Sequence, residues 1–168
     1  MLDTLYALGT WLNTTDAHFW ARGLLRSASW VSPTVQSIHI VSMAVVIGTI
    51  GFIDLRMLGV AARSQSPAEM ARRLMPWFWM ALVLLFLTGA MLILNRPARY
   101  FDNIAFFAKV LLLVLGVALT LVLVRGLARG EDHWTTTPAK VRAARLIAGV
   151  SAAAWVGVVL AGRWIAYA

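Results

Sequence analysis

The sequence is organised around residues 34–59, which read TVQSIHIVSMAVVIGTIGFIDLRMLG. A Ser-Pro pair at 32–33 precedes this stretch, and such a pair is typical of a helix start. The interior of the stretch holds one ionisable side chain, His39, before it closes with Asp54 and Arg56. About 20 residues at a rise of 1.5 Å cross the hydrocarbon core of a bilayer. The stretch therefore predicts a membrane-spanning helix at residues 34–57.

The composition extends this prediction to the whole chain. Of its 168 residues, 61% are hydrophobic and only 13% are charged, which is far fewer charges than a soluble domain carries. The net charge of +8 raises the possibility of nucleic-acid binding, but the basic residues lie at the ends of apolar runs, where membrane proteins place them. The absence of cysteine excludes disulfides and thiolate metal sites.

Three further apolar runs predict spans at residues 77–94, 104–124 and 146–165. Capping residues predict where their helices begin, at Ser66-Pro67, Asp102-Asn103 and Thr137-Pro138. Residues 16–30 combine aromatic side chains with two arginines and predict an amphipathic helix in the membrane interface. We therefore expect an all-α, integral membrane four-helix bundle, preceded by an interfacial helix, as one membrane domain over residues 1–168.

The distribution of basic residues predicts the orientation of the spans in a bacterial inner membrane. Nine basic residues flank the two connections on one side, and five lie on the other side. The positive-inside rule then places both termini in the periplasm. The nine are Arg56, Arg63, Arg72, Arg73, Arg125, Arg129, Lys140, Arg142 and Arg145, and the five are Arg22, Arg26, Arg96, Arg99 and Arg163.

Small residues recur every four positions in the fourth span, at Gly149, Ala153, Gly157 and Ala161. Helices in lipid associate through such close-packing faces. The pattern fits a compact bundle, and it fits equally well a contact with another membrane protein or with a second copy of the chain.

The polar residues within the spans mark the place where chemistry is expected. His39 lies about 7 Å inside the periplasmic end of its span, and Lys109 lies at a similar depth in the third span. Met91 and Arg163 occupy the same layer, next to a Thr-Gly pair at 88–89. This layer predicts a haem or porphyrin site in which His39 ligates iron and Lys109 or Arg163 pairs with propionates. Copper bound by His39, Met43 and Met91 is the rival prediction.

Several of these residues also have simpler interpretations. His39 can donate a hydrogen bond that holds two helices together, and the Lys109 stem can reach the headgroups. Asp54 is expected to pair with Arg56 or another arginine. A non-enzymatic subunit of a larger membrane complex is therefore the alternative function. His18 is expected to have a surface role, and His133 to be solvated.

The motifs His39-Ile40, residues 54–59 (DLRMLG), Pro76, Thr88-Gly89 and residues 107–109 (FAK) resemble a family of small uncharacterised bacterial membrane proteins. More distantly, this pattern is similar to the membrane protoporphyrinogen oxidase of haem synthesis and to the copper-resistance D membrane proteins. The oxidase resemblance implies that His39 is a haem ligand and Lys109 an essential polar partner, with an interfacial role for Arg56 or Arg73. A bis-histidine haem needs a second histidine in the spans, which this sequence does not have.

Overall fold

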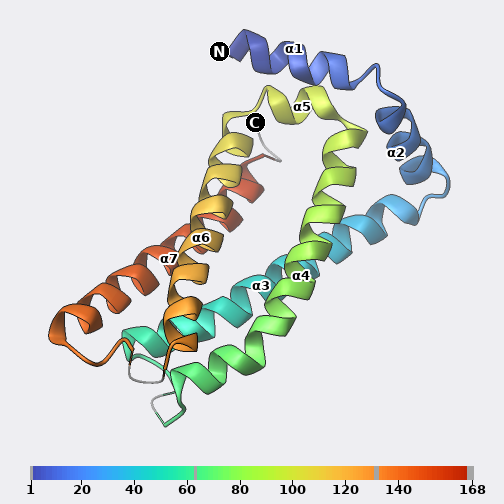
Figure 1. The fold of residues 1–168 in the computed structure, drawn as a ribbon. Coiled ribbons are helices and arrows are strands. Elements are labelled where there is room, and N and C mark those ends of the chain that lie inside the picture. The colour runs from blue at the N-terminus through green and yellow to red at the C-terminus, as the bar shows by residue number, and fades with distance from the viewer. Residues whose placement is uncertain (1, 63, 131–132, 166–168) are drawn as a thin grey trace.

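The computed structural model describes residues 2–62, 64–130 and 133–165, and these residues form helices and no strands, as the sequence predicts. Two short N-terminal helices lead into a bundle of four long ones, and Figure 1 shows how they are arranged. The short helices are α1 (Leu2–Leu12) and α2 (Asp16–Arg26). The others are α3 (Val31–Leu58), α4 (Pro67–Asn95), α5 (Pro97–Phe101), α6 (Ile104–Ala128) and α7 (Pro138–Trp164).

The helices α3, α4, α6 and α7 are each long and apolar enough to cross a membrane. Large apolar side chains cover their outer faces: Phe86 is 73% exposed, Leu111 70% and Leu146 69%. Contact with water would make such a surface unfavourable, whereas lipid chains are as apolar as these side chains. The chain is therefore a membrane protein with four spans, which confirms the predicted fold class.

Side-chain caps confirm most of the predicted helix starts. Thr15, Ser66 and Thr137 each accept a backbone N–H from three residues ahead, and Asn103 accepts one from two residues ahead. The start of α3 differs from the prediction. It begins at Val31, so the Ser-Pro pair lies inside its first turn, where the missing N–H of proline costs nothing.

One other helix boundary also differs from the prediction. The amphipathic helix ends at Arg26 and not at residue 30. The Ser27 hydroxyl donates to the Leu24 carbonyl at 2.7 Å, and a side chain bonded in this way competes with continuation of the helix. The helix α4 begins at Pro67, as predicted, and continues through Pro76 to Asn95, so the predicted span of 77–94 is the later part of one longer helix.

The four long helices run antiparallel in two pairs, α3 with α4 and α6 with α7 (Figure 1). We call the end at which α3 and α6 begin the His39 end; the connections at residues 59–66 and 129–137 lie at the opposite end. At the His39 end, α1 lies against α5 and α2 lies beside α4.

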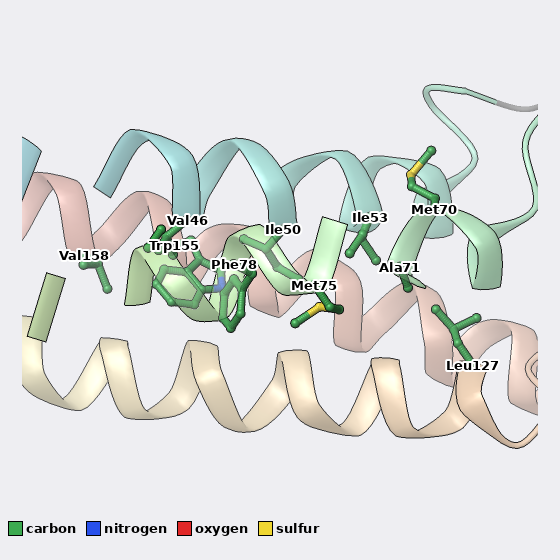
Figure 2. Packing of buried hydrophobic residues seen from close by; sticks show 11 residues of the cluster. Val46, Ile50, Ile53, Met70, Ala71, Met75, Phe78, Leu127, Trp155 and Val158 are labelled. Carbon is green, nitrogen blue, oxygen red and sulfur yellow. The ribbon is translucent and has the colours of Figure 1, made fainter. Parts of the chain in front are cut away.

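The core is centred on Trp155 of α7, which is 1% exposed. Its ring meets Phe78 of α4 edge-on with centroids 5.9 Å apart, as Figure 2 shows, and its Nε1–H donates to Thr120 Oγ1 at 3.4 Å. Val46 and Ile50 of α3 pack into the same cluster. Toward the His39 end, α6 has no buried residue before Gly116 and α3 has none before Ser42, so these two helices contribute little to the core there.

The small residues of α7 are used in different ways. A Cβ on Gly157 would lie 2.9 Å from Leu112 of α6, so this glycine admits close packing within the chain. Gly149 faces Leu58 of α3 at 3.9 Å, but Ala153 is exposed. The series therefore serves the chain's own bundle in part, and it does not form one continuous outward face.

Candidate functional site

The ring of His39 on α3 is joined to α4 through Thr88. The Thr88 hydroxyl contacts the Leu84 carbonyl at 2.6 Å and the His39 Nδ1 at 2.9 Å. A hydroxyl has one hydrogen and a carbonyl only accepts, so the hydroxyl donates to Leu84. Nδ1–H must then donate to the Thr88 oxygen.

This chain of hydrogen bonds fixes the tautomer of His39. With the proton on Nδ1, the neutral ring carries its lone pair on Nε2. Histidines that bind metals are held in the same way, by a hydrogen bond from the nitrogen that does not bind the metal. The site thus presents an oriented imidazole nitrogen from a half-buried position in α3.

Gly89 lets the His39 ring lie close to α4. A Cβ at this position would stand 3.3 Å from the ring's Cε1 and 3.8 Å from Nδ1. A larger residue would have to displace the ring, because a contact of 3.3 Å is tighter than side chains normally tolerate. The Thr-Gly pair therefore sets both the hydrogen bond and the position of the imidazole.

The charge of Lys109 on α6 interacts with His39. Its stem runs along Gly162 of α7, where an added Cβ would lie 3.4 Å from Nζ and 3.6 Å from Cε. Both helix pairs thus contribute a polar group to the His39 end, and these are the two residues singled out from the sequence. An ammonium next to an imidazole gives the site a positive potential, which favours anionic groups.

The other predicted site residues lie on α3, α4 and α7. Met91 is half-buried on α4, three residues beyond Thr88, and Met43 is half-buried on α3. Arg163 is exposed in the last turn of α7. The described residues contain no group of three or more His, Asp or Glu side chains that could hold a metal ion.

The two remaining histidines have structural contacts, and the predicted surface role of His18 is wrong. His18 is 4% exposed, and its Nδ1–H donates to the Leu94 carbonyl at 2.7 Å. It fastens α2 to the C-terminus of α4, where helix carbonyls lack partners. His133 is half-buried, with its ring against Trp134 at a centroid distance of 5.1 Å.

The predicted ion pair between Asp54 and an arginine is also wrong. Arg56 Nε–H donates to the Gln65 carbonyl at 2.7 Å. Asp54 is fully buried, and its two carboxyl oxygens have no hydrogen-bond partner of normal geometry. The Asp54 carboxyl group points toward Ser151 of α7. Side chains two positions apart on a helix face different directions, so Asp54 does not meet Arg56.

Comparison with known proteins assigns a family and no activity. The model of DUF6644, a family of unknown function, matches residues 27–168, which leaves α1 and α2 outside the match. No curated protein and no solved structure matches the chain. The expected membership of a small membrane family is thereby supported, but no similarity to protoporphyrinogen oxidase or to the copper-resistance D proteins is shown.

Proposed function

The chain belongs to the DUF6644 family, whose function is unknown, and we propose from the site itself that the protein binds a haem or porphyrin at the His39 end. In this proposal His39 is the iron ligand. Haem supplies one-electron redox chemistry, and the protein would hold and orient it within the membrane.

The observation that carries the proposal is the fixed tautomer of His39. Its Nδ1–H is committed to Thr88, which leaves the Nε2 lone pair for iron. A histidine that served only to join α3 and α4 would need no charged group near it. Here a second feature is present, because the charge of Lys109, on a helix from the other pair, also acts on His39.

Lys109 favours a cofactor that carries carboxylates. Haem has two propionates, and a charge-assisted contact with an ammonium is stronger in the low dielectric of a membrane. Arg163 lies one residue beyond Gly162, against which Lys109 packs, and would meet a propionate nearer the interface. The absence of buried residues in α6 before Gly116 is consistent with room for a ligand between the helix pairs.

Copper remains the rival cofactor, with Met43 and Met91 as possible soft ligands. The charge of Lys109 argues against it, because a bare cation at His39 would be repelled by the ammonium. Iron inside a porphyrin is repelled less by the ammonium, because the macrocycle and its propionates bring compensating negative charge. The electrostatics of the site therefore favour haem over copper.

The experiment is an absorption spectrum and metal analysis of full-length protein purified in mild detergent, followed by titration with hemin. We expect a Soret band that His39→Ala abolishes. Lys109→Gln should weaken hemin binding by about tenfold, since a charge-assisted contact is worth roughly 1.5 kcal/mol. His133→Ala is the matched control, because this ring lies in the loop at the opposite end and should leave the band unchanged.

Other outcomes identify the alternatives. Copper without a Soret band would assign the rival cofactor. A colourless protein that binds neither hemin nor copper, and stays folded as His39→Ala, would contradict the proposal. The histidine would then join helices only, and the non-enzymatic subunit would be the better description.

A further inference from the structure

A polar pocket of about 230 Å³ lies at the His39 end, apart from the His39 site. Two arginines of α2, Arg22 and Arg26, form one wall. Arg96 and Arg99, where α4 passes into α5, form the facing wall. Side-chain amides complete the lining at Asn13 and Asn95. Four arginines, two from α2 and two from the junction of α4 and α5, thus line one small volume.

Three of the four arginines in this pocket are not neutralised by a neighbouring acid in the described residues. Arg22, Arg26 and Arg96 form no ion pair with any carboxylate in the described part of the chain. Burial raises the pKa of Tyr100, although Arg99 and Arg96 oppose the shift, so the phenol next to the pocket stays neutral at physiological pH. Like charges held close together are unfavourable unless an anion joins them.

The walls of the pocket are fixed by contacts that do not depend on a ligand. His18, which also lines the pocket, is 96% buried and ties α2 to α4 through the Leu94 carbonyl. Gly9 of α1 packs against Phe101 of α5, where a Cβ would lie only 3.0 Å from the phenylalanine Cβ. The arginines therefore extend from anchored helices, and the pocket exists before any anion binds.

The surroundings place this pocket at the depth of lipid headgroups. It lies where α4 ends and α6 is about to begin, so it marks one boundary of the spans. The aromatic side chains Phe19, Trp20 and Trp30 are 60%, 63% and 66% exposed on and just after α2. Exposed tryptophans at the end of a span are typical of the interface between membrane and water.

We propose that this pocket binds the phosphate of an anionic phospholipid headgroup. Guanidinium groups recognise phosphate through paired, charge-assisted N–H···O contacts, and the two asparagine amides can donate to the remaining headgroup oxygens. The headgroup would join α2 to the α4–α5 junction. This site is independent of His39 and of any cofactor there.

The test measures lipid binding to full-length protein in zwitterionic detergent, by thermal shift and by native mass spectrometry. The probe is short-chain phosphatidylglycerol, compared with short-chain phosphatidylcholine and with inorganic phosphate. We expect phosphatidylglycerol to bind and to raise the melting temperature, and phosphatidylcholine to do neither. In the variant Arg22→Gln/Arg96→Gln binding should fall about 25-fold, because each arginine near an anionic headgroup contributes roughly fivefold.

The matched control is Arg125→Gln/Arg129→Gln, which removes two exposed arginines at the opposite end and should leave lipid binding unchanged. If the double pocket variant does not fold, the single variant Arg26→Gln replaces it in the test. It changes only one side chain, which is exposed, so the fold should tolerate the change. Equal losses in the pocket and control variants would overturn the proposal. Inorganic phosphate that binds as tightly as the lipid and competes with it would show that the pocket takes a soluble phosphate compound instead, and would overturn the lipid assignment.

Discussion

The Asp54 carboxyl group faces the Ser151 hydroxyl inside the bundle, and neither group has a hydrogen bond of normal geometry. Both residues are 0% exposed. One lies in the last turns of α3 and the other in the middle of α7, so the contact joins the two helix pairs. No cation pairs with this carboxyl group in the described residues, since Arg56 turns to Gln65.

Replacing this carboxyl group with an amide should change stability little. An ionised carboxylate buried without a counter-charge costs several kcal/mol, which favours the neutral acid, and asparagine has almost the same shape. We expect Asp54→Asn to alter the free energy of unfolding by less than about 1 kcal/mol, measured by SDS titration of tryptophan fluorescence. A loss of about 3 kcal/mol or more would mean that the carboxylate is ionised and paired, which contradicts this view of the site.

The contact between Gly116 and Trp155 should be intolerant of even one methyl group. A Cβ on Gly116 would lie 2.9 Å from Cε2 of a fully buried indole that is also packed against Phe78. We expect Gly116→Ala to lower the free energy of unfolding by about 1–3 kcal/mol. Gly48→Ala is the control, since nothing lies within 4 Å of its Cβ position; equal effects of the two changes would contradict the packing argument.

Gly89→Ala should disturb the His39 ring without unfolding the bundle. The added methyl group would stand 3.3 Å from Cε1, so the imidazole must move by a few tenths of an ångström. We expect a stability loss of no more than about 1 kcal/mol, together with a shifted Soret band in hemin-loaded protein. The comparison variant is Gly51→Ala, whose Cβ position has no neighbour within 4 Å. A spectrum shifted equally in both variants would argue that the ring does not hold the cofactor.

The orientation in the membrane follows from the basic residues and can be tested with reporter fusions. Ala62 and Gly130 lie in or beside the two connections at the opposite end from His39. More basic residues flank these connections than the His39 end, so both fusions should report the cytoplasm and both termini the periplasm. An external signal from either fusion would reverse the predicted topology.

The sequence determined the fold class and most helix starts of this protein. Four apolar runs are each long enough to cross a bilayer as a helix, which satisfies every backbone hydrogen bond within the segment. Caps such as Ser66 and Thr137 act on backbone groups three residues away, so their effect can be recognised in the sequence alone. The depth of each residue within its membrane span could also be predicted, because the rise per residue of a helix is constant. That calculation put His39 and Lys109 in one layer.

Tertiary structure alone decided which way each polar side chain faces. Helix rotation depends on how whole faces pack, and it placed Thr88 against His39 while turning Asp54 toward Ser151 and away from Arg56. His18 shows the same limit: nothing local indicates that its ring will reach the Leu94 carbonyl, 76 positions away in sequence. Such contacts arise between helices far apart in the chain, where side-chain volumes and helix crossing determine the partners.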